Sequence, residues 1–120
     1  MKIALSTTGY CLGAPLESRF GRSPRFIIYE LDNGSFEVIE NKLNANAPQG
    51  AGVQTAANLI TADIKAVITG HCGPKAFSML DNAKIPVYLA GNVSVSKAIE
   101  LYKSKTLSKQ ESADVDGHWQ

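Results

Sequence analysis

The sequence lacks long hydrophobic runs. No apolar stretch in its 120 residues approaches the roughly 20 residues that a membrane-spanning helix needs. The apolar stretch that follows Lys2 is also too short for the hydrophobic region of a signal peptide, and it is typical of a first strand instead. We therefore expect a cytoplasmic protein that has no membrane among its partners.

Cysteine and net charge are also scarce. Two cysteines do not make a disulfide framework, and a reducing compartment would keep both as thiols that are available for metal binding or redox chemistry. The formal net charge of +1 argues against a nucleic-acid-binding protein, which usually has a strongly basic face. The spacings that define a zinc finger, a zincin, a thioredoxin or a P-loop are absent from the sequence.

What is present is an alternation of strand-like and helix-like segments. Short apolar or alternating stretches predict strands at residues 2–6, 25–31, 35–40, 65–69 and 86–90. Asn33-Gly34 is a strong hairpin signal between the second and third of these strands. Helical spacing of apolar residues predicts helices that end near Ala62, begin at Pro74 and begin after Ser94. This order is typical of an α/β domain with a mixed sheet.

The two ends of the chain differ in character. Residues 1–106 contain every predicted strand and helix, and we predict that they form a single domain. Residues 107–120 are polar and have no periodic apolar face, so we predict a flexible tail there.

The loops that follow three predicted strands contain candidate ligands and cations. In an open α/β sheet, such loops meet beyond the carboxyl ends of the parallel strands, and the adjacent helix starts favour anions. The side chains that could bind a metal are Cys11, His71 and Cys72. The cations are Arg19, Arg22 and Lys75. The sequence therefore predicts an electropositive, glycine-lined site at this edge of the sheet.

Cys72 has two competing interpretations. A helix start and the nearby Lys75 would favour its thiolate form, which is a good metal ligand. Cysteine is also among the most frequently buried residues, so an inert position in the core is the alternative. Neighbouring residues in an extended segment point in different directions, and His71 and Cys72 therefore need not bind the same ion.

Four stretches of the sequence together resemble a known family. These stretches are MKIALST, RFGRSPRFIIYELDNG, GAGVQTAANLI and VITGHCGPKAFSMLDNAKIPVYLA. They resemble, in order and over residues 1–106, the dinitrogenase iron-molybdenum cofactor biosynthesis family. The resemblance implies a ribonuclease H-like fold with three α/β/α layers around a five-stranded mixed sheet, in which the second strand is antiparallel.

The resemblance also implies a function. Single-domain members resemble carriers or assembly scaffolds, so we expect a protein that is not an enzyme and that binds an anionic metal-sulfur cluster of the iron-molybdenum or molybdenum-copper type. Proteins that deliver or receive the cluster would be its partners.

Individual residues can be matched to the family pattern. Arg19-Phe20-Gly21-Arg22 stands where the family usually has His-Phe-Gly-Arg, so an arginine replaces a common histidine ligand. This change favours electrostatic retention of an anion over direct coordination at that position. The predicted cluster-binding residues are Arg19, Arg22, Gly70 and Gly73, which match the family pattern, and Lys75, which adds a cation beside the helix start. The predicted metal ligands are Cys72, His71 and Cys11.

Three alternative functions make different demands on the sequence. A nuclease would need several carboxylates at the strand ends to hold two metal ions. Here the first strand ends in Ser6, and the loops after the other two parallel strands begin with Gly70 and Gly91. A thiol redox protein or sensor would use Cys11 and Cys72 as a reversible disulfide pair. A domain that binds a small organic anion, such as a nucleotide phosphate, at the helix starts is the remaining alternative.

Overall fold

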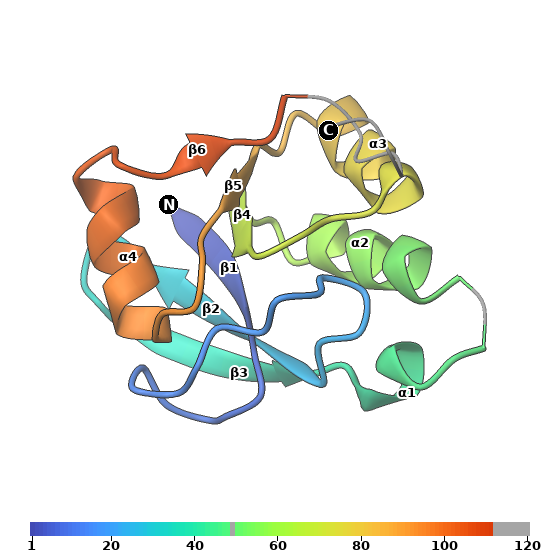
Figure 1. Ribbon diagram of the computed structural model, residues 1–120, viewed down its shortest axis with the longest axis horizontal. Helices are drawn as coiled ribbons and strands as arrows, with labels where there is room; N and C mark the ends of the chain where they lie inside the picture. Colours follow the sequence, from blue (N-terminus) through green and yellow to red (C-terminus); the bar gives the residue numbers. More distant parts are fainter. Residues whose placement is uncertain (49, 112–120) are drawn as a thin grey trace.

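A mixed β-sheet lies at the centre of the computed structural model, which describes residues 1–48 and 50–111 (Figure 1). Within these residues six strands pair in the order β3-β2-β1-β4-β5-β6. Their bounds are β1 (Lys2–Thr7), β2 (Arg25–Glu30), β3 (Phe36–Glu40), β4 (Ala66–Thr69), β5 (Val87–Leu89) and β6 (Ser108–Lys109). β1, β4 and β5 run parallel, whereas β2, β3 and β6 are antiparallel to their neighbours.

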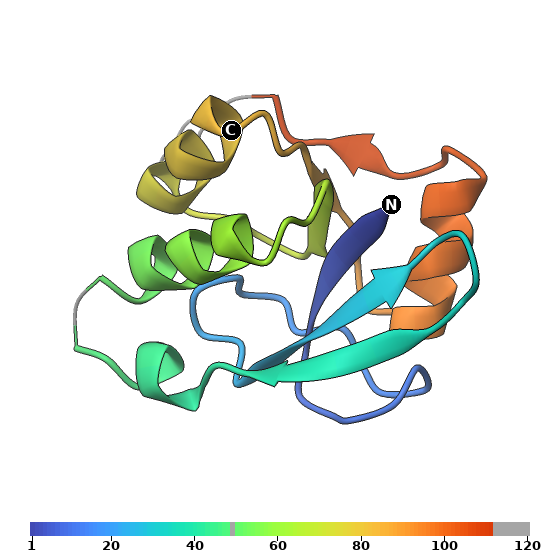
Figure 2. The ribbon, with the colours of Figure 1, turned by 180° about the vertical axis from the view of Figure 1, so that it is seen from behind.

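Helices cover both faces of this sheet (Figures 1 and 2). They are α1 (Lys42–Ala45), α2 (Ala51–Thr61), α3 (Pro74–Asn82) and α4 (Val95–Lys103). α2 and α3 pack on one face, where the buried cluster includes Leu59, Phe77 and Leu80. α4 packs on the other face through Val95, Ala98 and Ile99. None of the helices in the described part of the chain combines the length and apolarity that a membrane span requires.

The sequence explains why the central strands are buried on both faces. β4 reads AVIT and all four residues are buried, as expected for a parallel strand between two helical layers. β2 and β3 form the predicted hairpin, and Gly34 has a φ of 77°, which a glycine adopts without strain. The Asn33 side-chain oxygen accepts a hydrogen bond from the Ser35 N–H at 2.9 Å and completes the turn. The mixed sheet and the antiparallel second strand are thus confirmed.

The expected number of strands needs correction. The sheet has six strands rather than five, because Ser108 and Lys109 form β6 inside the segment predicted to be a polar tail. This strand pairs through its backbone and needs no apolar period, so the sequence pattern gave no sign of it. Besides the three predicted helices, the structure contains a short helix, α1. Residues 112–120 of the predicted tail lie outside the described residues, and the ribonuclease H-like class stays a prediction.

Candidate functional site

The long loop after β1 folds back over the carboxyl end of the sheet. Buried hydroxyl groups at the end of the strand hold it there: the Ser6 Oγ donates to the Glu17 carbonyl at 2.7 Å, and the Thr7 Oγ1 donates to the Pro15 carbonyl at 2.8 Å. The Ser23 Oγ accepts from the Thr7 N–H at 3.0 Å. A loop without periodic sequence is therefore fixed to the end of β1 by hydrogen bonds between side chains and backbone groups.

This loop also joins the loop that follows β4. The Phe20 N–H donates to the His71 carbonyl at 3.0 Å. A Cβ atom on Gly70 would lie 2.7 Å from the Ser18 carbonyl oxygen, so only glycine allows the two backbones to approach so closely. The Phe20 side chain is 1% exposed and anchors the loop in the core. As a result, Arg19 and Arg22 are held beside the helix starts.

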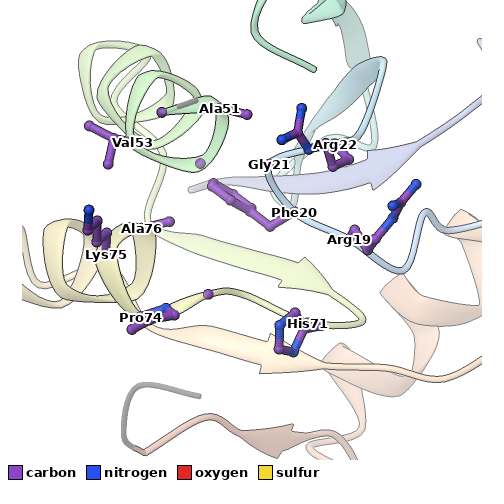
Figure 3. Close-up of a pocket in the computed structure, with 13 residues that line it drawn as sticks. Arg19, Phe20, Gly21, Arg22, Ala51, Val53, His71, Pro74, Lys75 and Ala76 are labelled. Carbon is purple, nitrogen blue, oxygen red and sulfur yellow. The ribbon is translucent and has the colours of Figure 1, made fainter. Parts of the chain in front are cut away.

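A pocket of about 410 Å³ lies where these loops meet the starts of α2 and α3 (Figure 3). Its volume is within the usual range for small-ligand sites. Backbone packing brings the walls together, because a Cβ atom on Gly21 would lie 2.8 Å from the Gly52 Cα. Its lining residues are Arg19, Phe20, Gly21, Arg22, Gly50, Ala51, Gly52, Val53, His71, Gly73, Pro74, Lys75 and Ala76.

The pocket lining is basic. Arg19, Arg22 and Lys75 contribute cations, and none of the described lining residues is acidic. Arg22 is held in place by its own contacts, since its Nη1 donates to the Ala45 carbonyl at 2.8 Å and to the Ala47 carbonyl at 2.7 Å. Its guanidinium therefore ties the end of α1 to the pocket wall.

The carboxylate of Glu17 contacts Arg19 but does not line the pocket. The Glu17 carboxylate accepts the Arg19 backbone N–H at 3.0 Å and lies 3.9 Å from the Arg19 Nε. The Arg19 side chain is 68% exposed, so this ion pair is screened by water and leaves the guanidinium accessible.

Two helices present free first turns to the pocket. α2 and α3 have Gly50 and Gly73 as N-cap residues, without a side-chain cap and without an acidic residue in the first turn. Within the described ranges, no acceptor is found for the N–H groups of Ala51, Gly52, Val53, Lys75 and Ala76. Such N–H groups and the positive ends of the helix dipoles favour an anion.

The structure brings most of the predicted site residues together. Arg19, Arg22, His71, Gly73 and Lys75 all line the pocket, although they come from two loops and a helix start (Figure 3). Gly70, the remaining residue predicted to bind the cluster, does not line the pocket. Its close approach to Ser18 gives it a role in joining the two loops.

The two cysteines lie apart from the pocket lining. Cys72 has no exposed surface and belongs to the core cluster beneath α2 and α3. Cys11 is exposed, and the adjacent Leu12 packs on the opposite face of the sheet. Among the described residues, no group of three or more histidine, cysteine or acidic side chains could hold a metal ion. Metal ligation by Cys72, His71 or Cys11 stays a prediction, and so does a redox pair of Cys11 and Cys72.

Sequence reasoning missed part of the site. It assigned no role to Gly50, Ala51 and Gly52, which form the α2 side of the pocket. The signal was present as two glycines at the start of a predicted helix, where a capping side chain is more usual. It also missed Gln110, which is buried and whose Nε2 donates to the Cys72 carbonyl at 3.1 Å. No local pattern marks this residue.

Comparison with known proteins gives consistent matches. The family model described as dinitrogenase iron-molybdenum cofactor matches residues 1–105. An uncharacterised protein of Methanocaldococcus jannaschii is 34% identical over 99 residues, which is 80% of this chain and 83% of that protein.

Two solved structures are similar over nearly their whole length. The apo form of the orange protein from Desulfovibrio gigas superposes with a TM-score of 0.90 at 25% identity and covers 95% of this chain and 96% of its own. A NifB-like protein from Thermotoga superposes with a TM-score of 0.84 at 28% identity and covers 97% and 98%.

Proposed function

The chain belongs to the dinitrogenase iron-molybdenum cofactor family, and from that premise we propose that its pocket binds an anionic metal-sulfur cluster as cargo. Membership of the family associates the chain with binding or biosynthesis of the iron-molybdenum cofactor. The finer proposal is that the protein carries or assembles the cluster and catalyses no reaction on an organic substrate. Proteins that deliver or receive the cluster would be its partners.

One observation supports this proposal most directly: two uncapped helix starts and three cations open onto the same pocket, and no described residue of its lining is acidic. Each helix start stabilises an anion by about 0.3–1 kcal/mol when exposed and by up to about 2 kcal/mol when partly buried. Several such contributions acting together suit a multiply charged inorganic anion better than a neutral ligand.

The pocket can retain a cluster without bonds to its metals. Sulfide and oxo groups of a preformed cluster accept hydrogen bonds, and both backbone N–H groups and guanidinium groups donate them. Apolar residues such as Val53, Pro74 and Ala76 also line the pocket and reduce the water around these contacts. Because Cys72 is fully buried, we favour retention by hydrogen bonds and charge over ligation by its thiolate.

The family description supports one choice of cargo metals. It names an iron-molybdenum cofactor, which supports molybdenum with iron as the cargo metals; molybdenum with copper is the alternative. The orange protein to which the chain is similar was solved in an apo form, and a releasable cargo agrees with that description.

Loading the purified protein tests the proposal. Protein purified without oxygen would be incubated with tetrathiomolybdate alone, with added Cu(I) or with added Fe(II), and then desalted. We expect molybdenum to be retained by elemental analysis, together with new visible absorption. Lys75→Ala should reduce retention, whereas Lys97→Ala, which removes a lysine from the first turn of α4, should not. Protein that retains no metal in any of these mixtures would disprove cluster binding.

The same assay distinguishes the alternatives. If the thiolate is a ligand, Cys72→Ala should abolish retention. We expect instead that Cys72→Ala retains molybdenum and that Arg22→Ala retains less of it than the wild-type protein. Tight binding of a nucleotide with no retention of molybdenum would instead support an organic-anion site. A reversible disulfide between Cys11 and Cys72, detected by mass spectrometry, would support the redox alternative.

A further inference from the structure

Gln110 is a buried polar residue near the end of the described chain. It follows β6, it is 6% exposed, and its N–H donates to the Val87 carbonyl at 2.8 Å. Burying an amide side chain costs free energy unless the amide is hydrogen-bonded. The hydrogen bonds of Gln110 therefore define where its side chain lies. The backbone bond fixes Gln110 beside β5 and leaves the side chain to reach the neighbouring loop.

The Gln110 side chain holds one peptide group of the pocket loop. Its Nε2 donates to the Cys72 carbonyl at 3.1 Å, and this hydrogen bond is buried. The preceding peptide group is held from the other side, because the His71 carbonyl accepts the Phe20 N–H at 3.0 Å. Two different parts of the chain therefore fix the loop between β4 and α3.

Peptide geometry then determines where the next N–H points. The peptide bond is planar and trans, so the N–H of Gly73 is antiparallel to the Cys72 carbonyl of the same peptide group. That N–H therefore points away from the buried Gln110 amide. Gly73 lines the pocket, and a Cβ atom added to it would meet nothing within 4 Å. Within the described residues, no acceptor is found for its N–H.

We propose that Gln110 is a positioning residue for the cargo site, because it orients the Gly73 N–H into the pocket; this role rests on the proposed function. Gln110 does not line the pocket, so it acts through the peptide group that it holds. It makes the N-cap of α3 a preformed hydrogen-bond donor for an anion. The contact also explains why a polar residue beyond the last helix is buried.

Gln110→Met tests the proposal, because it keeps the size of the side chain and removes the donor. We expect the dissociation constant for tetrathiomolybdate to rise about fivefold to tenfold, the effect of one lost hydrogen bond. Its dependence on salt should not change, because no charge is removed. In the ligand-free protein, the Gly73 amide resonance should shift. Ser108→Ala changes an exposed residue of β6 and is the matched control. It should leave the dissociation constant, its salt dependence and the Gly73 amide resonance unchanged.

The outcomes separate this proposal from the proposed function. If the wild-type protein binds tetrathiomolybdate and Gln110→Met binds it equally well, the positioning role is wrong and the cargo site stands. If the wild-type protein binds none, the proposed function fails and the positioning role fails with it. Should Gln110→Met not fold, Gln110→Asn retains a polar amide that is too short to reach the Cys72 carbonyl. The same loss of affinity is expected, and wild-type affinity in that variant would overturn the role.

Discussion

Among the described residues, the three long helices α2, α3 and α4 begin at the same edge of the sheet, but only α4 has its first turn closed by other segments. At the start of α4, the Val95 N–H donates to the Ala14 carbonyl at 2.8 Å and the Ser96 N–H donates to the Leu12 carbonyl at 2.7 Å. The Ser94 Oγ accepts the next N–H, from Lys97, at 3.1 Å. α2 and α3 begin without a side-chain cap.

The loop after β1 produces this difference. Its first half supplies the carbonyls that close α4, and its second half brings Arg19 and Arg22 beside α2 and α3. The second half supplies cations where the first supplies acceptors. Uncapped helix ends cost stability unless something else satisfies their N–H groups. We infer that α4 is closed for stability and that the two open helix starts are kept for a ligand.

A side-chain cap at the start of α3 should make this helix start resemble that of α4, and we expect the largest effect on anion binding from this change. Gly73 has φ −67° and ψ 169°, a conformation that any residue adopts at an N-cap. We expect Gly73→Asp to raise the free energy of unfolding by about 0.5–1 kcal/mol and to weaken tetrathiomolybdate binding at least about tenfold. The gain in stability and the loss of binding have the same cause, because the new carboxylate accepts hydrogen bonds from the open N–H groups. Denaturant unfolding and a binding titration measure the two quantities.

Gly91→Asp is the control for this change. Gly91 follows β5 in a loop outside the pocket lining, and a Cβ atom there meets nothing within 4 Å. Binding should be unchanged in this variant. A weakening equal to that of Gly73→Asp would show that added negative charge alone explains the result, and that the open start of α3 does not.

Replacing the two arginines of the pocket one at a time should distinguish a residue that binds by charge from one that also stabilises the fold. The expected loss of binding is smaller than for Gly73→Asp. Arg22→Ala removes the donor to the Ala45 and Ala47 carbonyls, so we expect the protein to lose about 1–2 kcal/mol of stability and to bind about tenfold more weakly. Arg19→Ala should weaken binding similarly, with a stability change within about 0.5 kcal/mol, because its ion pair is exposed. Both should reduce the salt dependence of binding. Equal losses of stability in the two variants would contradict this division of roles.

The closed and open helix starts also show how much of the molecule could be predicted from its sequence. Periodicity predicted the central strands and the three long helices, because burial on one or two faces leaves a pattern in neighbouring residues. The helix start after Ser94 was predicted for the same reason, since a helix start depends on one residue and the turn that follows it. These features are local.

What could not be predicted depends on contacts between distant segments. β6 pairs by its backbone, and Gln110 reaches a carbonyl 38 residues earlier in the chain, so neither leaves a local pattern. Cys72 was ambiguous because a strand end is equally compatible with the core and with the surface, and packing of α2 and α3 decides between them. The cations were predicted from loop position, while the double role of Arg22 required the fold.

Removing the side-chain cap of α4 is the reverse of capping α3, and it should have the smallest effect on anion binding in the pocket. Ser94→Ala removes the acceptor of the Lys97 N–H, and loss of such a cap costs about 1 kcal/mol. The Leu12 and Ala14 carbonyls still close the first two N–H groups, so the start of α4 should remain unable to bind an anion. We expect a lower free energy of unfolding in denaturant and an unchanged dissociation constant for tetrathiomolybdate. A second equivalent of the anion bound by Ser94→Ala would mean that one side chain, rather than the loop after β1, keeps α4 closed.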